Sequence, residues 1–598
     1  MSDVALKTLR QGWHGIFRAS LLEIMPVGAL AEHFNPVFGA PTKELYSIAG
    51  LILIKEYFDW TCEQAVNAYM FDQSVQYALN MPTEKVSLCE RTLERYMAIY
   101  REDDLAIEVM ETVTVRLTQL LDLDVARQRL DSTHLFSNMA QFGRTRLMGV
   151  AIKRFFTQVK RHDEAAWLEI PEAMRARYAT SEQRLFGDVR GPENRAKLRQ
   201  DVANDLYWLV ERFADHSRFK TATTYKALAR IFWEQCDVKT AKTPVDAAPS
   251  QTPPSPCADE TPETGPDGDA APDACAPPEI VPKAKTGGNV MQNPSDPEAT
   301  YDGHKGPGYQ VQLSETCGPD NDTQLITAAL VQGAAEPDVN ALGQVLDALE
   351  KTGLTPESLL ADTAYGADEN VLESAQRGVE LVSPVPGKAP APGNFTLSDF
   401  ITDPDTGHVL QCPAGHAPES STLDEQTGTI HTRMGPGTCA GCAHREQCPV
   451  RQRQKGGALE HTGKQQRIDA RRTAQQSEKF RERYKKRGGI ESTNSGLKRR
   501  CGLGRLRVRG LKAVSRAVYL KVAGWNIARA AAALRKRARE AAKGRNEGAY
   551  SGQPAHDSGR RGKKWPRQTL VAIRIALWGA IARRWPDEVQ PRILERAA

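Results

Sequence analysis

Three acidic residues stand in sequence contexts that suit metal-dependent chemistry. Asp131 follows a strand-like run over residues 125–130, and Asp362 follows another over 358–361. Glu491 opens a predicted helix. A mixed sheet that gathers three carboxylates offers the oxygen ligands that two Mg²⁺ ions prefer, and two such ions about 4 Å apart can drive phosphodiester displacement. We therefore take these three acids as the candidate catalytic and magnesium-binding residues.

Basic residues flank the third acid at helical spacing. Counting from Tyr484, Arg487, Glu491 and Lys498 occupy positions i+3, i+7 and i+14, which lie near one face of a helix. A metal-binding acid with Arg and Lys on its own face suits a phosphate backbone lying across the metals. A solvated basic helix is the plainer interpretation, but such helices usually alternate charge sign.

The charge of the chain is concentrated around the same residues. The 598 residues carry a formal charge of only +5, yet residues 481–545 hold 21 Lys and Arg against three acids, a local charge of +18. The remainder of the chain is then near −13. A basic segment of this kind favours a polyanionic partner, most plausibly nucleic acid, and predicts strongly salt-dependent binding.

Four of the 11 cysteines lie within 37 residues, in a Gly-, Thr- and Pro-rich segment. Cys439 and Cys442 form a CxxC pair, with Cys412 before them and Cys448 after them. Four thiolates in a loop-rich segment predict a structural, tetrahedral Zn²⁺ site. His416 and His444 are reserve ligands; an iron–sulfur cluster and free buried cysteines are the alternatives.

The elements that must position these residues divide into several parts. Residues 1–124 read as a helical N-terminal domain, equally compatible with a helix-turn-helix DNA reader and a plain bundle. The predicted catalytic domain is assembled from 125–140, 289–384 and 466–545. Between its first two pieces lie a helical insertion, 141–240, and an acidic, Pro-rich, disordered linker, 241–288. A zinc-binding insertion covers 385–465, and 546–598 form a tail with an amphipathic helix over 567–584.

The catalytic pieces follow an α/β pattern. Strands are predicted at 309–313, 325–331, 358–361 and 379–382, with helices over 338–352 and 369–377. Together with the strand before Asp131, they predict a mixed five-stranded sheet covered by helices. Helical sequence returns near residue 467 and continues to 543, with a break over 502–510.

Other classes of protein are disfavoured by the sequence. The apolar runs are far shorter than the roughly 20 residues that span a bilayer, and the first residues lack a signal-peptide pattern. The odd cysteine count fits reduced thiols or a metal site better than a disulfide framework. We expect a cytoplasmic protein with no membrane partner.

The acids and their neighbours also carry a family resemblance. They resemble the bacterial insertion-sequence transposases of the DDE type that bear the YREK signature, in the insertion sequence 4-like and insertion sequence 1182 groups. The matching residues are Leu130-Asp131-Ser132-Thr133, the run from Leu360 to Gly366, and Tyr484, Arg487, Glu491 and Lys498 with Arg499 and Arg500 behind them. The resemblance covers about residues 10–530.

The resemblance implies a fold, a reaction and partners. It implies a ribonuclease H-like catalytic domain, Mg²⁺-dependent cleavage at transposon ends, and attack of the freed 3′-hydroxyl on target DNA. Tyr484, Arg487, Lys498, Arg499 and Arg500 would bind DNA. The N-terminal helices would bind terminal inverted repeats, and a homodimer would bridge two ends, associated with the nucleoid when bound to DNA.

The chain departs from the family pattern in two places. Asp131 and Asp362 are 231 positions apart, because the helical insertion and the linker intervene. Residues 384–465 contain no Trp, so the resemblance does not imply hairpin-forming cleavage. Two alternatives stay open: a catalytically inactive, zinc-containing DNA-binding protein derived from a transposase, and a ribonuclease H-like nuclease without strand transfer.

Overall fold

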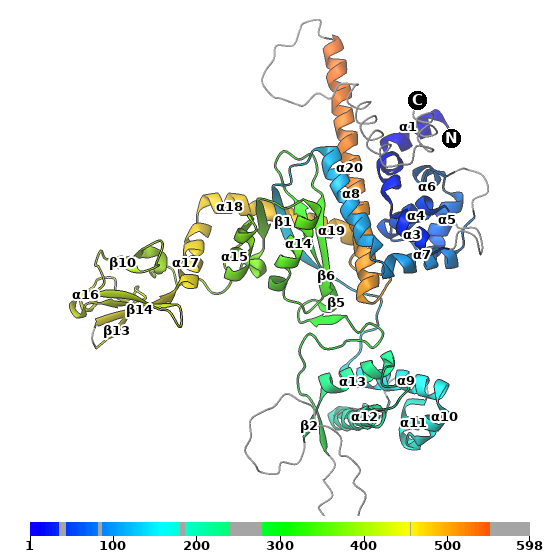
Figure 1. Cartoon of the computed structure of the whole chain (residues 1–598), viewed down its shortest axis with the longest axis horizontal. Coiled ribbons are helices and arrows are strands. Elements are labelled where there is room, and N and C mark those ends of the chain that lie inside the picture. The colour runs from blue at the N-terminus through cyan, green and yellow to red at the C-terminus, as the bar shows by residue number, and fades with distance from the viewer. Residues whose placement is uncertain (35–43, 82–86, 180–185, 240–277, 455, 551–598) are drawn as a thin grey trace, which may run out of the picture. The chain divides into compact units, whose positions relative to one another are not determined.

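The computed structural model describes residues 1–34, 44–81, 87–179, 186–239, 278–454 and 456–550 (Figure 1). The chain divides into two compact units, Met1–Arg535 and Lys536–Ala598. The candidate acids, basic residues and cysteines all lie in the first unit.

The N-terminal region is helical, as predicted. Its α-helices are α1 (Asp3–Gln11), α2 (Trp13–Ile16), α3 (Val27–Glu32), α4 (Leu45–Tyr57), α5 (Cys62–Phe71), α6 (Gln73–Ala78), α7 (Glu90–Glu102) and α8 (Leu105–Leu121). Helix α4 is apolar around its whole circumference and is almost wholly buried, as expected for a helix at the centre of a helical domain.

A mixed sheet forms the centre of the first unit. Its strands are β1 (Arg127–Leu135), β4 (Thr300–Asp302), β5 (Gly306–Thr316), β6 (Ile326–Gly333), β7 (Ser358–Ala361) and β8 (Glu380–Val382). The order is β4-β5-β1-β7-β8, and β6 pairs with β5. Strand β5 runs antiparallel to β1, β4 and β6, whereas β1, β7 and β8 are parallel. The sheet has six strands, not the predicted five, because the chain before β5 folds back on it as β4.

Helices cover both faces of the sheet (Figure 1). On one face α14 (Leu342–Thr352) packs against β6 and α15 (Asp368–Gln376), and its buried leucines share a core with Leu130 and Tyr365. On the other face α8 and two later helices, α19 (Gly489–Arg500) and α20 (Leu511–Tyr550), share a core with Val311 and Leu313 of β5. Alternate residues of β1 therefore belong to different layers.

The helical insertion has its own core. It contains α9 (Arg144–His162), α10 (Glu164–Glu169), α11 (Glu172–Ala179), α12 (Gly191–Phe213) and α13 (Thr223–Gln235). Strand β2 (Cys236–Lys239) leaves this insertion and pairs with β3 (Glu279–Pro282). The linker prediction is therefore wrong at its C-terminal end, where β2 supplies the hydrogen-bonding partner that residues 279–282 lack by themselves. Residues 240–277 lie outside the described part.

The cysteine-bearing insertion is built of short strands. One pair joins β9 (Ile401–Thr402) to β10 (Val409–Gln411), and a second sheet has the order β11 (Ser420–Asp424), β12 (Thr429–Met434), β14 (Gly456–Thr462), β13 (Arg451–Arg453). A short helix, α16 (Pro436–Ala440), carries the first cysteine of the CxxC pair.

The predicted helical region after this insertion is interrupted more often than expected. It forms α17 (Gly463–Gln475), α18 (Glu478–Lys485), a 3-10 turn η6 (Lys486–Gly488) and α19. The break over 502–510 separates α19 from α20, as predicted. The amphipathic helix predicted over 567–584 lies outside the described residues. In the part that is described, no helix is both long and apolar enough to cross a membrane.

Candidate active site

Asp131 lies in the middle of β1, not at its end. The strand continues to Leu135 because residues 128–135 pair in an unbroken antiparallel register with β5. Leu130 and Ser132 face the α14 layer, and Asp131 faces the opposite layer with α19, where Asn494 donates a hydrogen bond to its carboxylate at 3.0 Å. The expectation that the strand ends on Asp131 is wrong, because the polar residues after this acid, which resemble a turn in composition, pair with β5.

Asp362 follows β7 directly, as predicted. It caps the 3-10 turn η4 (Thr363–Tyr365), and its carboxylate accepts a hydrogen bond from the Ala364 amide at 2.9 Å. Because Leu130 pairs in parallel with Ala361, and an acid follows each of these two residues in the chain, the two carboxylates stand at the same level of the sheet.

Arg487 brings the third acid to the first two. Its Nη2 lies 2.6 Å from Asp131 Oδ1 and 3.7 Å from Asp362 Oδ2, and its Nη1 lies 3.1 Å from Glu491 Oε1. The guanidinium is mostly buried, with 15% of its side chain exposed, whereas Glu491 is 67% exposed. One cationic group is thus shared by three carboxylates that are far apart in the sequence.

The electrostatics of this cluster reflect its burial. Burial raises the pKa of Asp131 to about 6; Arg487 opposes this rise, and the carboxylates of Asp362 and Asp338 add to it. An acid that resists ionisation next to other acids benefits from a nearby cation.

The remaining residues of the signature lie around the acids but not on one helix. Tyr484 lies in the last turn of α18, and Arg487 lies in η6, so the predicted single helix is divided before Glu491. The Tyr484 ring stacks on Phe480, with centroids 5.7 Å apart, and burial raises the pKa of its phenol. Burial and the nearby Lys305 lower the pKa of Lys498, which the charge of Asp131 partly offsets.

Arg499 and Arg500 end α19 on the exposed side of the helix. Arg499 donates to the carbonyl of Ser495 in its own helix. Both residues are exposed at the C-terminal end of the helix that begins near Glu491, where guanidinium groups suit phosphate contacts more than metal binding.

Several residues of the cluster did not emerge from the sequence. Asn494 lies at i+3 from Glu491, so the helical-face argument applied to the signature could have found it. Ser132 donates to Asp338 at 3.0 Å, and Gln312 donates to the same acid at 2.8 Å. These two contacts depend on the distant β5 and on the turn after β6, and no sequence spacing signals them.

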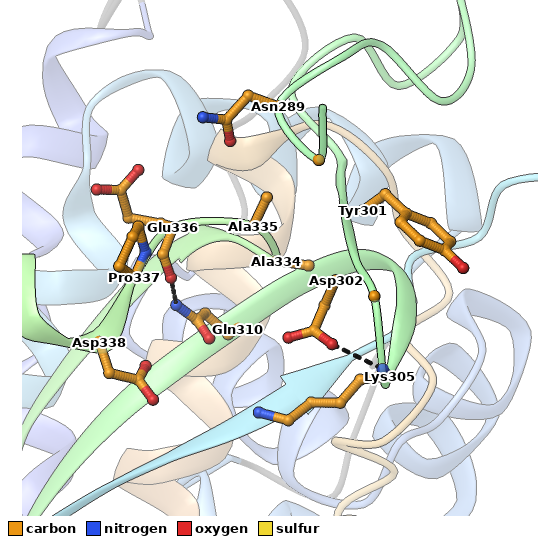
Figure 2. Close-up of a pocket in the computed structure, with 12 residues that line it drawn as sticks. Asn289, Tyr301, Asp302, Lys305, Gln310, Ala334, Ala335, Glu336, Pro337 and Asp338 are labelled. Atoms are coloured by element: carbon orange, nitrogen blue, oxygen red, sulfur yellow. Dashed lines mark hydrogen bonds between the residues drawn. The ribbon is translucent and has the colours of Figure 1, made fainter. Parts of the chain in front are cut away.

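A pocket of about 330 Å³ borders this network (Figure 2). Asp302, Lys305, Gln310 and Asp338 surround it, and the Gln310 side chain donates to the carbonyl of Glu336 at 2.6 Å. Asp338 belongs both to this pocket and to the network beside Asp131. The acids of the lining outnumber its one lysine, which disfavours a phosphate group inside the pocket.

The four predicted zinc ligands converge in the small β insertion. Cys412, Cys439, Cys442 and Cys448 line one cavity of about 110 Å³, and His416 and His444 line it too. Burial raises the pKa of Cys439, and the thiols of Cys448, Cys412 and Cys442 raise it further. Converging thiols that disfavour one another's ionisation suit a cation that would hold them as thiolates.

Neither the three acids nor the four cysteines have the geometry of a metal site in this structure. Among the described residues, no group of three or more His, Cys, Asp or Glu side chains is arranged as a metal site. In the acid cluster the Arg487 guanidinium lies between the carboxylates, and in the insertion the thiols surround a cavity. The donor types still fit the two expected ions: oxygen for Mg²⁺ and sulfur for Zn²⁺.

Comparison with known families adds an independent observation. Residues 411–531 match the family model of a transposase DDE domain. The matched segment holds the four cysteines, Tyr484, Arg487, Glu491, Lys498, Arg499 and Arg500. Asp131 and Asp362 lie before it. The match supports a DDE transposase, and with it DNA recombination and transposition. No curated protein and no solved structure matches the chain.

Proposed function

We propose that this protein is the DDE transposase of an insertion sequence, with Asp131, Asp362 and Glu491 as its catalytic acids. The observation that carries the proposal is the meeting of the three carboxylates at the Arg487 guanidinium. The third acid and the arginine belong to the segment that matches the transposase DDE domain. The first two acids reach the same place through the parallel pairing of β1 with β7.

The sheet supports a ribonuclease H-like fold for the catalytic domain. Apart from the short β4, its order is β6-β5-β1-β7-β8, with β5 antiparallel to its neighbours and the last three strands parallel. A mixed sheet covered by helices agrees with the ribonuclease H-like domain that the family resemblance implies. It explains how an insertion of more than a hundred residues between β1 and β5 leaves the acids together.

The side chains have distinct roles in this proposal. The three carboxylates would hold two Mg²⁺ ions, which supply activation of the attacking oxygen and stabilisation of the leaving oxygen. Arg487 and Lys498 would bind phosphate oxygens of the DNA beside the cleaved bond, because Arg487 pairs with Asp131 and Lys498 is close enough to interact with the charge of that acid. Tyr484, supported by Phe480, would orient the backbone next to them.

A structural Zn²⁺ held by Cys412, Cys439, Cys442 and Cys448 is part of the same proposal. Four protein ligands leave no open coordination position, so the ion would stabilise the insertion without taking part in cleavage. The insertion has a small apolar core, made of Leu397, Phe400, Val409 and Leu459, with Ile430 and Met434 also buried. A metal is a common substitute for a small core.

Asp131→Asn tests the catalytic assignment. The purified variant should bind transposon-end DNA as wild type does, and its cleavage and strand transfer in Mg²⁺ should fall by about a thousandfold or more, since a metal ligand is lost. Asp347→Asn, at a surface acid paired with Arg377, is the matched control and should cut normally. Normal cleavage by Asp131→Asn would refute the assignment.

The same assay separates the alternatives. A wild-type protein that cuts DNA but forms no joined product is a nuclease, and one that binds ends without cutting is an inactive relative. Terminal inverted repeats and a short target duplication around the coding region are expected if the chain is the transposase of an insertion sequence.

A further inference from the structure

A buried ion pair lies two residues from Asp131 on the same face of β1. Arg129 donates to Glu315 Oε2 through Nε at 2.8 Å and through Nη2 at 2.5 Å. The Glu315 side chain is fully buried, and that of Arg129 is 12% exposed. The two residues pair across β1 and β5, so this contact fixes both side chains to the sheet that carries the first acid.

Arg129 also bonds to η6, just before the helix that carries the third acid, and Glu315 bonds to that helix itself. The Nη1 of Arg129 donates to the carbonyl of Lys486 at 3.1 Å, and the hydroxyl of Thr493 donates to Glu315 Oε1 at 2.6 Å. Lys486 and Thr493 bracket the segment that holds Arg487 and Glu491. Thr493 is only 2% exposed, so its bond to Glu315 is shielded from water.

The approach of sheet and helix is close. A Cβ atom at Gly489 would lie 1.9 Å from Nη1 of Arg129, so only glycine lets the guanidinium lie against the start of α19. Buried ion pairs are weak stabilisers, because desolvation cancels most of their attraction, but their hydrogen bonds are directional. Directional bonds define the position of the helix along the sheet more sharply than an apolar contact does.

We propose that Arg129, Glu315 and Thr493 are positioning residues that set the place of Glu491 relative to Asp131. They act through the backbone at Lys486 and the first turns of α19. This inference rests on the proposed function, because it concerns the relative position of two of the proposed catalytic acids.

The test compares two substitutions of one buried residue in the full chain. Thr493→Val removes the hydroxyl at nearly constant size, and Thr493→Ser keeps it. We expect Thr493→Val to lower the cleavage rate at saturating DNA about tenfold or more and to raise the Mn²⁺ concentration for half-maximal binding several-fold. Its affinity for end DNA should stay within about twofold of wild type, and Thr493→Ser should behave as wild type.

Asp205→Asn is the control for the loss of a buried polar contact. Asp205 accepts hydrogen bonds from Arg177 and Tyr178 within the helical insertion, so this variant should lose stability without a change in Mn²⁺ binding. Hydrogen exchange supplies a readout that does not depend on catalysis: amides of residues 487–494 should exchange faster in Thr493→Val than in Thr493→Ser.

The outcomes are distinct. Equal exchange and equal Mn²⁺ binding in the two Thr493 variants overturn the positioning role, even if wild type cleaves DNA. A wild type that fails to cut refutes the proposed function, while a difference in exchange between the two variants still supports the anchoring of the helix by Glu315.

Discussion

At the scale of single residues, the Arg487 guanidinium contacts all three candidate acids. Its guanidinium supplies positive charge to carboxylates of which one, Asp131, already has a pKa raised by burial. A metal ion entering the same space would compete with this side chain for the same oxygens. The arginine that would hold DNA phosphate is therefore also the residue that compensates the acids when no metal is present.

Removal of that guanidinium should strengthen metal binding. Arg487→Ala should bind Mn²⁺ roughly tenfold more tightly than wild type in the absence of DNA, because a nearby charge typically changes such equilibria by one or more powers of ten. Isothermal titration of the full chain measures the affinity. Arg483→Ala is the control, since Arg483 pairs with Glu380 away from the acids. Unchanged or weaker Mn²⁺ binding by Arg487→Ala would contradict the competition.

At the scale of elements, the junction between η6 and α19 depends on two adjacent glycines with different surroundings. A Cβ at Gly489 would collide with the guanidinium of Arg129, whereas a Cβ at Gly488 meets nothing within 4 Å. Gly488→Ala and Gly489→Ala are therefore a matched pair of substitutions. Only Gly489→Ala places a methyl group against Arg129, so the pair tests whether DNA cleavage depends on the close approach of the helix to the sheet.

Gly489→Ala should reduce DNA cleavage about tenfold or more, and Gly488→Ala should have little effect. The two hydrogen bonds from Arg129 to Glu315 Oε2 leave the arginine little room to move aside, so we expect the new methyl group to shift the helix. Cleavage rates and melting temperatures of both variants check the prediction. Equal activities would show that the junction adapts without cost.

The cysteine-bearing insertion is predicted to depend on a bound Zn²⁺ for its folded structure. Purified protein should contain about one Zn²⁺ per chain, and Cys442→Ser should lose it and expose 385–465 to proteolysis, because a ligand of the tetrahedral set is missing. Metal analysis and limited proteolysis measure both effects. Cys89→Ser, at an exposed cysteine outside the insertion, should keep the ion. Full zinc content in Cys442→Ser would refute the ligand set.

At the scale of the whole first unit, some cations of the basic segment, residues 481–545, form buried ion pairs within the protein. Arg516 and Lys521 of α20 are buried against Glu56 at the end of α4. Lys521 Nζ donates to the Glu56 carbonyl at 2.8 Å, to Asp59 at 3.0 Å and to the Cys501 carbonyl at 2.6 Å. The local charge of +18 therefore overstates the surface offered to DNA, because some cations tie the N-terminal helices to the end of α19.

Glu56→Gln tests these buried ion pairs through the pH dependence of the free energy of unfolding. Burial by itself raises the pKa of Glu56, but Arg516, Lys55 and Lys521 together hold it below its ordinary value of 4.5. A lowered carboxyl pKa stabilises the fold above the unfolded pKa, and this stability is lost as pH falls through the folded value. At pH 7 the variant should be about 3 kcal/mol less stable than wild type.

The difference between variant and wild type should shrink as the pH falls below about 4. Denaturant unfolding at several pH values measures it. Glu102→Gln, at an exposed acid paired with Arg101, should change stability little at any pH. A difference between Glu56→Gln and wild type that does not vary with pH would contradict the charge assignment.

The sequence by itself predicted much of the fold and the candidate residues, because those features are local. A short apolar run predicts a strand such as 358–361. The spacing of residue types identifies the signature from Tyr484 to Lys498, and the clustering of the cysteines identifies the candidate zinc ligands. The length of β1 beyond Asp131 did not show, because polar strand residues resemble a turn until a partner strand pairs with them.

Only the tertiary structure decided how these parts act together. The place of Arg487 among the three acids, and the anchoring of α19 by Arg129 and Glu315, join residues more than 180 positions apart. Such contacts produce no periodic pattern in the sequence, and the sequence does not distinguish a buried arginine from an exposed one. The sequence named the acids, and folding alone determined which cations and hydroxyls hold them in register.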